Sequence, residues 1–372
     1  MRRAVISRLQ AAVVTHGLDA LVAASPDNVT YSLGFAIPSQ SLAIRNRLFL
    51  FIVGRSGATA LIAAAPEVTF VQMQDRDLRT IPYDEFSDDP MLVLVQVLRE
   101  IGVEERCVGI ETDFLPGVYF DRLRMLMPEV VFVSAASIYA ALRAVKTPEE
   151  VELLRRVNQA ARRAWVRGCA DAHVGIAERD LARLMIHHLY DEGVDEVRLV
   201  QVGSGVRSSF ANPYPTDRRI EQGDLVKVDI SATMGGYYSD TGGAAVAGSV
   251  PKDFARIWSG MVRTQEAVLR AMRPGISTRA LWEIFEREFA AAGLKVVNRF
   301  IGHGLGISVH EEPFIGRDRD VPLAEGMVLA VEPVFKVPGE LGFHLEDVVV
   351  VTGDGIDALT DPAEYAELRI IS

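Results

Sequence analysis

The sequence of 372 residues predicts an α+β protein with two domains, an α/β domain over residues 1–140 and a larger domain over residues 141–372. Two observations support this fold class. Helical and strand patterns alternate through the first 140 residues, which is typical of an α/β domain. In the rest of the chain, a helix followed by a hairpin is predicted twice, which indicates an internal repeat.

The elements of the first domain follow from apolar periodicity. Helical spacing covers residues 3–16 and 90–101. Short apolar runs bounded by turn residues predict strands at 20–24, 48–53 and 58–63. These elements form a domain that precedes the repeat.

A strong helix start marks the boundary between the two domains. Thr147 is an N-cap residue, Pro148 occupies the first helical position and Glu150 completes a capping box. A new helix is therefore predicted from Pro148 onwards. We place the connection between the domains near residues 134–146.

The repeat is visible in two segments of the second domain, residues 175–193 and 275–293. Each starts with Gly-Ile, ends in Gly and has an amphipathic helical pattern between them. We interpret them as parts of two helix-plus-hairpin units related by a pseudo-two-fold axis. Chance similarity between two helix-and-strand stretches is the alternative, because few residues are identical.

Each repeat unit contains a predicted hairpin with two acidic residues. In the first hairpin Asp229 and Asp240 are expected to lie directly opposite each other, because their midpoint falls in the turn. In the second, Gly339 is the midpoint between Glu332 and Glu346. Directly opposed side chains have Cβ atoms roughly 5 Å apart. Each hairpin is therefore expected to hold a pair of carboxylates.

His303 adds a nitrogen ligand to these acids. It lies between Gly302 and Gly304, with Gly306 following, and the three glycines predict a loop that approaches a ligand closely. Paired carboxylates repel each other unless a cation lies between them. Four carboxylates and one imidazole, without a thiolate, suit Mn²⁺, Co²⁺, Fe²⁺ or Zn²⁺.

The expected chemistry of such a site is hydrolysis. Two metal ions about 3.5–4 Å apart would share a bridging hydroxide, which acts as a nucleophile near neutral pH. The alternative is that these residues are ordinary solvent-facing acids of an acidic protein. Asp229 argues against that alternative, because it lies in an otherwise apolar strand and an ionised group there needs a partner.

Composition excludes several other classes of protein. The net charge of −11 argues against a nucleic-acid surface. Cys107 and Cys169 are too few for a disulfide framework or a zinc cluster. No apolar run approaches the ~18 residues needed to span a bilayer, and the basic start lacks a signal-peptide core. A cytoplasmic enzyme that binds neither nucleic acid nor membranes is expected.

These motifs resemble the "pita-bread" metallopeptidase family, M24, which contains Xaa-Pro aminopeptidases, prolidases, methionine aminopeptidases and creatinase. The resemblance implies a C-terminal pita-bread (creatinase/aminopeptidase) catalytic domain with pseudo-two-fold symmetry. The first domain is similar to the creatinase-type N-terminal domain of prolidase relatives, and such domains often support homodimers. The resemblance rests on these stretches: Gly302-His303-Gly304-Leu305-Gly306, His310-Glu311-Glu312-Pro313, Leu323-Ala324-Glu325-Gly326-Met327-Val328 and Val331-Glu332-Pro333.

The resemblance also implies roles for individual residues. His310 is expected to contact the substrate and to stabilise the tetrahedral intermediate, and Glu332 to act as a proton shuttle as well as a ligand. Two divalent ions are expected, with Mn²⁺ first and Co²⁺, Zn²⁺ or Fe²⁺ as alternatives. The five implied metal ligands are Asp229, Asp240, His303, Glu332 and Glu346.

Three positions depart from the family pattern. Asn212 stands where prolidase-like members carry a histidine, Gly243 where an arginine is usual, and His344 where an arginine is frequent. Asn212 and His344 are expected substrate contacts. An asparagine cannot carry a proton, and a neutral imidazole does not form the bidentate fork of an arginine, so the substrate range is expected to differ.

Three functions remain open at this point. The first is an exopeptidase that cleaves Xaa-Pro bonds of short peptides through the metal-bridging hydroxide. The second is a creatinase-like C–N hydrolase acting on a small amide or amidine metabolite, and the third is a catalytically silent binding protein. Arg45 and Arg47 of the first domain are candidates to bind a substrate carboxylate.

Overall fold

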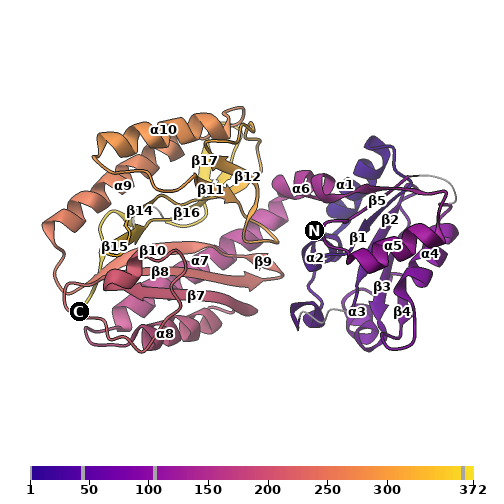
Figure 1. The fold of residues 1–372 in the computed structure, drawn as a ribbon, viewed down its shortest axis with the longest axis horizontal. Coiled ribbons are helices and arrows are strands. Elements are labelled where there is room, and N and C mark those ends of the chain that lie inside the picture. The colour runs from indigo at the N-terminus through magenta and orange to yellow at the C-terminus, as the bar shows by residue number, and fades with distance from the viewer. Residues whose placement is uncertain (1, 43–46, 104–106, 362–364) are drawn as a thin grey trace. The chain divides into compact units, whose positions relative to one another are not determined.

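The computed structural model describes residues 2–42, 47–103, 107–361 and 365–372. The chain forms two compact units, Met1–Arg143 and Ala144–Ser372 (Figure 1). Within the described residues, no helix has both the length and the apolar character required to cross a membrane.

The first unit is built on a mixed six-stranded sheet with strand order β4-β3-β2-β1-β5-β6. β1 pairs antiparallel with β2 and parallel with β5. The strands are β1 (Ala20–Ala23), β2 (Leu50–Gly54), β3 (Thr59–Ala64), β4 (Thr80–Tyr83), β5 (Cys107–Ile110) and β6 (Val131–Ser134). The strands predicted from the sequence are confirmed within about two residues at each end.

Among its described residues, six α-helices and two short 3₁₀ helices complete the first unit. Both predicted helices are present, as α1 and α4. The helices are α1 (Arg2–Thr15), α2 (Pro26–Leu33), α3 (Val68–Gln74), α4 (Pro90–Glu100), α5 (Gly117–Leu126) and α6 (Ala136–Ala144), with η1 (Pro38–Leu42) and η2 (Ala65–Glu67).

The connection between the units is helical rather than irregular. Helix α6 covers most of residues 134–146, where a linker was predicted. Its sequence, ASIYAALRA, consists largely of good helix formers, and these residues explain why the connection is helical. The capping box that follows is confirmed: Thr147 Oγ1 accepts a bond from the Glu150 amide at 3.3 Å, and Glu150 Oε2 accepts one from the Thr147 amide at 2.8 Å.

The first half of the second unit is a helix pair followed by a mainly antiparallel sheet. The sheet has the order β18-β10-β8-β7, with β9 also paired to β8. A core of α7, α8 and sheet residues lies between the two layers. The elements are α7 (Pro148–Asp171), α8 (Glu178–Asp191), β7 (Glu196–Ser204), η3 (Gly205–Ser209), β8 (Leu225–Met234), β9 (Tyr237–Tyr238) and β10 (Thr241–Ala247).

The second half repeats this plan. Its sheet has the order β12-β11-β13-β16-β17, and β14 pairs with β15 separately. The elements are α9 (Lys252–Ala271), α10 (Thr278–Ala291), β11 (Phe300–Gly304), β12 (Glu311–Gly316), β13 (Val328–Val331), β14 (Val334–Val337), β15 (Leu341–His344), β16 (Asp347–Val351) and β17 (Ile356–Ala358). The last strand, β18 (Arg369–Ile371), returns to the first sheet beside β10.

The two halves are related as the repeat predicted. In Figure 1, α9 and α10 lie along one side of the unit, and the strands of both halves lie between them and α8. Isolated bridges occur at matching points, Ala177 with Arg219 and Ser277 with Pro322, just before α8 and α10. The pseudo-two-fold arrangement is confirmed, and it leaves the acidic hairpins between two helix pairs.

Candidate metal centre

The first pair of acids lies at the hairpin of β8 and β10. β8 extends further than predicted, and the turn is made by Gly235 and Gly236, whose φ angles of 57° and 83° suit a two-residue hairpin turn. Asp229 therefore lies opposite Gly242, so the prediction that Asp229 and Asp240 are directly opposed is wrong by two residues. Because a shift of two residues keeps a side chain on the same face, both carboxylates still reach one site.

The second pair lies where two paired segments of a long hairpin meet. β13 pairs with β16 and β14 with β15 in one continuous register. That register places Glu332, between β13 and β14, opposite Glu346, between β15 and β16. The predicted register is confirmed, and Gly339 at the turn has a φ angle of 77°.

His303 lies within strand β11, where a loop was predicted. A Cβ on Gly302 would overlap the carbonyl oxygen of Ala330, and one on Gly304 would overlap that of Glu312. The prediction of a ligand-binding loop is wrong for these two glycines. They allow neighbouring strands to pack closely on both sides of His303.

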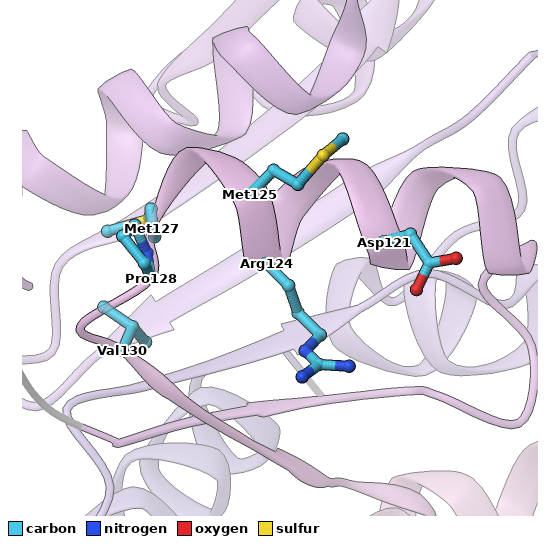
Figure 2. A pocket seen from close by; sticks show the side chains of 6 residues that line it. All are labelled: Asp121, Arg124, Met125, Met127, Pro128 and Val130. Carbon is cyan, nitrogen blue, oxygen red and sulfur yellow. The ribbon is translucent and has the colours of Figure 1, made fainter.

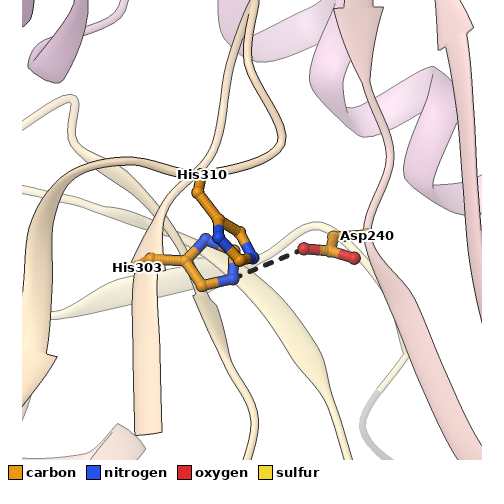
Figure 3. Close-up of side chains that lie close together, drawn as sticks. All are labelled: Asp240, His303 and His310. Carbon is orange, nitrogen blue, oxygen red and sulfur yellow. Dashed lines mark ion pairs between the residues drawn. The ribbon is translucent and has the colours of Figure 1, made fainter. Parts of the chain in front are cut away.

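The imidazole of His303 is oriented by the backbone. Its Nδ1 lies 3.0 Å from the carbonyl oxygen of Gly304. A carbonyl only accepts, so Nδ1 donates in this bond, and Nε2 is the ring nitrogen that faces the carboxylates. Nε2 lies 3.3 Å from Glu332 and 3.5 Å from Asp240, the second of which is drawn in Figure 3.

All five predicted ligands are brought together. Among the described residues, two sets of three side chains have ligand atoms within 4.8 Å of one another. Glu332 joins them through its contact with His303. The first set contains His310, which was predicted as a catalytic and substrate-contacting residue and not as a metal ligand. The sets are Asp240, His303 and His310, and Asp229, Asp240 and Glu346.

Two buried atoms of the cluster indicate that it fits a cation. His303 Nε2 and Glu346 Oε2 have no hydrogen-bond partner within the part of the chain that the structure describes. His303 is fully buried and Glu346 is 1% exposed. Buried polar atoms are nearly always paired, and an imidazole nitrogen and a carboxylate oxygen that face other carboxylates suit a divalent metal ion bound by oxygen and nitrogen.

The pKa values of the carboxylates reflect their crowding. Burial raises the pKa of Asp229, and it raises the pKa values of Asp240 and Glu346 well above their ordinary range, with neighbouring carboxylates adding to the effect. Burial also opposes ionisation of Glu332, but His303 and His344 outweigh it and lower the pKa of Glu332. A bound cation would relieve the repulsion among these groups.

His310 borders the cluster on its exposed side. Its ring centroid lies 4.0 Å from that of His303 and about 6 Å from those of Phe300 and Phe314. Burial, followed by the neighbouring His303, lowers the pKa of His310. A neutral imidazole with one N–H is therefore available beside the centre.

Gln201 is a site residue that the sequence analysis missed. It lies on β7 opposite Asp229 and is 4% exposed. Its Nε2 donates to Asn212 Oδ1 at 3.2 Å, while its Oε1 has no partner among the described residues. The only sequence signal was a polar residue between two valines. Asn212 is thus tied to the metal-centre face of the sheet.

Lys227 was also missed, and it anchors the loop that carries Asn212. It lies on β8 two residues before Asp229, hence on the same face of the strand. Its Nζ donates to the carbonyl oxygens of Phe210 and Ala211. Burial lowers the pKa of Lys227 to about 8.

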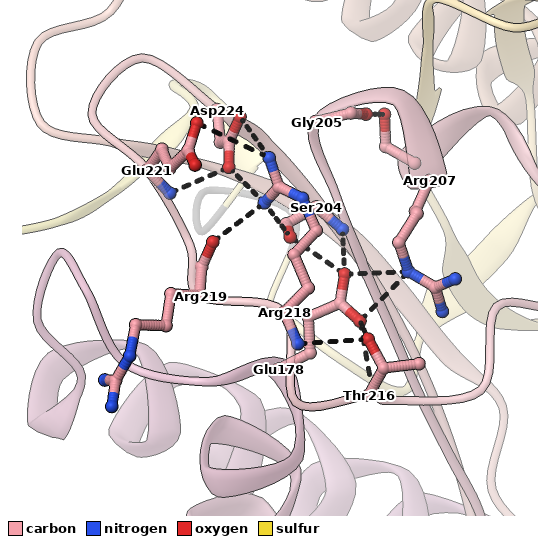
Figure 4. Close-up of polar contacts among 10 residues, drawn as sticks. Glu178, Ser204, Gly205, Arg207, Thr216, Arg218, Arg219, Glu221 and Asp224 are labelled. Atoms are coloured by element: carbon pink, nitrogen blue, oxygen red, sulfur yellow. Dashed lines mark hydrogen bonds and ion pairs between the residues drawn. The ribbon is translucent and has the colours of Figure 1, made fainter.

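A buried carboxylate holds the other end of this loop (Figure 4). Glu178, the first residue of α8, is fully buried and accepts bonds from the amide and hydroxyl groups of Ser204 and Thr216, and from Arg207. Burial opposes ionisation of Glu178, but these bonds lower its pKa. Lys227 and Glu178 therefore hold the loop from β7 to β8 at several points along its length.

Close packing surrounds two of the positions that depart from the family pattern, Gly243 and His344. A Cβ on Gly242 would overlap the His344 ring and lie 2.7 Å from Glu346 Oε2. His344 Nε2 lies 3.3 Å from Glu332 Oε2 and can donate to it. A Cβ on Gly243 would lie 2.8 Å from the indole nitrogen of Trp165. The imidazole of His344 therefore has room only because residue 242 is a glycine.

One of the two arginines predicted to bind a substrate carboxylate is paired within its own unit. Arg47 donates to Glu85 at 2.7 Å and lies 3.4 Å from Glu67, so its guanidinium already has acidic partners. Arg45, the other candidate, lies outside the described residues.

A surface cavity of about 520 Å³ lies beside α5 in the first unit (Figure 2). It contains one acid and one arginine, and none of its residues belongs to a potential metal cluster within the described chain. The metal centre therefore remains the stronger candidate for a functional site. The cavity is lined by Asp121, Arg124, Met125, Met127, Pro128 and Val130.

Comparison with known families identifies both parts of the chain. A family model described as metallopeptidase family M24 matches residues 152–353. A second, described as the creatinase/prolidase N-terminal domain, matches residues 6–145.

Individual relatives match over nearly the full length. A probable dipeptidase PepE of Mycobacterium tuberculosis is 32% identical over 87% of this chain and 86% of its own length. An Xaa-Pro dipeptidase of Lactobacillus helveticus is 28% identical over 98% of both chains. The crystal structure of dipeptidase PepE from Mycobacterium ulcerans superposes with a TM-score of 0.85 and 28% identity, covering 100% of this chain and 98% of that one.

Proposed function

The chain belongs to metallopeptidase family M24, and from this membership and its metal centre we propose that it is a dinuclear-metal-dependent exopeptidase that cleaves Xaa-Pro bonds of short peptides. The observation that carries the proposal is the convergence of four carboxylates on His303, whose inward nitrogen has no hydrogen-bond partner among the described residues. The names of the relatives support a dipeptidase, and one of them supports the preference for proline.

We assign the metal ions to the five predicted ligands. Asp229, Asp240 and Glu346 form one group of oxygen donors, and His303 with Glu332 adds the nitrogen side of the centre. When bound, the two ions would polarise the scissile carbonyl and activate water. Mn²⁺ is the metal we propose, because the donor set is mostly oxygen.

The remaining groups act on the substrate. His310, neutral and at the exposed edge, donates an N–H to the oxygen that becomes negative in the transition state. Glu332 accepts a proton from water and passes it to the leaving nitrogen, while His344 holds its second oxygen. Asn212 and Gln201 offer amide hydrogen bonds for the ends of a short peptide.

The test is hydrolysis by metal-stripped protein with and without added Mn²⁺. The substrates are Xaa-Pro dipeptides, the same sequences lengthened by one residue, and Xaa-Ala dipeptides as controls. Cleavage before proline that depends on Mn²⁺ is the expected result, and the length preference separates a dipeptidase from an aminopeptidase. Absence of cleavage by protein that holds two ions would contradict the proposal.

A second candidate is a creatinase-like hydrolase of a small amide or amidine. The altered residues Asn212 and His344 favour it, because both stand at positions where the family resemblance implies contact with the substrate. Turnover of small amides or amidines by protein that is inactive on every peptide is the outcome expected from this candidate.

Two further expectations belong to the proposal. A homodimer is expected from the resemblance of the first unit to creatinase-type domains, and light scattering of the purified protein tests it. A cytoplasmic location is expected from the composition, and cell fractionation tests it.

A further inference from the structure

A buried ion pair lies beside the metal centre without contributing a predicted ligand. Lys146 Nζ lies 3.0 Å from Glu311 Oε2, and the two side chains are 1% and 5% exposed. Lys146 directly precedes the N-cap of α7, and Glu311 directly follows His310 as the first residue of β12. The pair therefore ties the start of the second unit to the segment that carries His310.

The carboxylate of Glu311 also organises the residues before His310. Its Oε1 accepts a hydrogen bond from the Ser308 amide at 3.1 Å. A Cβ on Gly306 would lie 2.7 Å from both carboxylate oxygens, so this glycine is required for the loop to close over them. The Gly306 carbonyl in turn accepts a bond from the Tyr238 amide at 2.8 Å. The loop is thus packed around one buried charge.

His310 and Glu311 share this support while facing different surroundings. Glu311 reaches the buried Lys146. His310 is exposed, and its ring lies against that of His303 with the two ring planes tilted by 50° (Figure 3). A shift of Glu311 would carry the His310 backbone with it, because the two residues are joined covalently.

We propose that the Lys146–Glu311 ion pair is the positioning element that fixes His310 over the metal centre. Neither residue touches the substrate, and both act through the loop of residues 304–310. A misplacement of about 1 Å in a catalytic group is enough to slow an enzyme by about 100-fold. The kinetic part of this inference rests on the proposed peptidase function, whereas the structural part does not.

The test separates positioning from simple stability. Glu311→Met leaves the buried Lys146 unpaired, so both the melting temperature and kcat are expected to fall. The double variant Lys146→Met/Glu311→Met removes both charges, and much of the melting temperature is expected to return. The kcat of the double variant is expected to stay at least tenfold below wild type, with KM and bound Mn²⁺ unchanged. Recovery of wild-type kcat in the double variant would overturn the proposal.

Hydrogen exchange supplies a readout that does not depend on peptidase activity. Amides of residues 304–310 are expected to exchange at least tenfold faster in the double variant loaded with Mn²⁺. Unchanged exchange at residues 304–310 in the double variant overturns the proposal, whether or not the wild-type protein hydrolyses peptides. A wild-type protein that hydrolyses none of the peptides refutes only the proposed function.

Two further variants complete the design. The control is Arg163→Met/Glu192→Met, which removes a 2.7 Å ion pair of the same unit and is expected to change neither kcat nor exchange at residues 304–310. Glu311→Gln, which keeps the shape and one acceptor oxygen, replaces the double variant if that protein does not fold. Wild-type kcat and exchange in Glu311→Gln also overturn the proposal.

Discussion

At the scale of single residues, His310 allows catalysis to be separated from metal binding. It stacks on His303 but is exposed, and its low pKa leaves it neutral at pH 7. Loss of one donor to a developing oxyanion costs about 10²–10³ in kcat. We therefore expect His310→Ala to lower kcat by about that factor while two metal ions stay bound.

Steady-state kinetics and elemental analysis of the same preparation measure both quantities. His187→Ala, on the exposed face of α8, is the control and is expected to leave both unchanged. Loss of one metal ion from His310→Ala would instead make His310 a ligand, as its position in a set with Asp240 and His303 permits.

Gly242 is the second residue with a specific expectation. Its missing side chain makes room for His344, which in turn contacts Glu332. Gly242→Ala is expected to destabilise the protein by about 1–3 kcal/mol through overpacking and to displace His344, with a loss of kcat/KM. Urea unfolding and peptide hydrolysis measure the two effects.

Gly355→Ala is the matched control, because a Cβ there meets no atom within 4 Å. The double variant Gly242→Ala/His344→Ala is expected to regain stability without regaining activity. Equal stability of Gly242→Ala and wild type would show that the ring moves aside at no cost.

At the scale of elements, the loop between β7 and β8 depends on Glu178 (Figure 4). Because the folded protein lowers the pKa of Glu178, its stabilising contribution is present above the unfolded value near 4.3 and is lost as the pH falls through the folded value. Glu178→Gln is expected to cost about 2–3 kcal/mol at pH 7, as for hydrogen bonds to a charged group. The difference in unfolding free energy between wild type and Glu178→Gln is expected to become smaller as the pH falls.

Urea unfolding of wild type and Glu178→Gln at pH 7 and at pH 4 measures this change. A difference in unfolding free energy that stays constant between the two pH values would show that the lost hydrogen bonds do not depend on the charge. Arg163→Met, which removes an ion pair on the outer side of α7, is expected to change stability by less than about 1 kcal/mol.

At the scale of the whole molecule, the proposed metal ions would link the two halves of the second unit. The first hairpin supplies Asp229 and Asp240, and the second supplies Glu332 and Glu346. Ions that bind only the folded state stabilise it by about 2.7 kcal/mol at 100 times Kd. Chelation is therefore expected to lower the melting temperature, and added Mn²⁺ to restore it.

Scanning calorimetry with a chelator and with graded Mn²⁺ tests this expectation. Mg²⁺ is the control ion, because it prefers water and oxygen ligands in near-ideal octahedral geometry. It is expected to raise the melting temperature less than Mn²⁺ does. Identical melting temperatures with and without chelator would contradict a metal centre between the two hairpins.

The sequence alone determined the features that depend on local pattern. The capping box at Thr147 and the register that sets Glu332 opposite Glu346 follow from residue types and spacing along a short stretch. The candidate acidic ligands were identified because ionised groups in apolar strands require partners, and His303 because glycines surround it. The turn at Gly235 was predicted, but the predicted pairing of the strands beside it was wrong by two residues. The residue types near the turn do not indicate how far β8 continues.

Only the tertiary structure decided the features that depend on distant contacts. In the sequence, Gln201 is only one polar residue in an apolar strand. In the structure, the pairing of β7 with β8 places it opposite Asp229. In the sequence, Gly302 and Gly304 suggest a loop. In the structure, the neighbouring strands pack closely against both glycines. Lys146 meets Glu311 across 165 positions of the chain. Such contacts are set by how the two halves pack, since no local propensity encodes which residues meet.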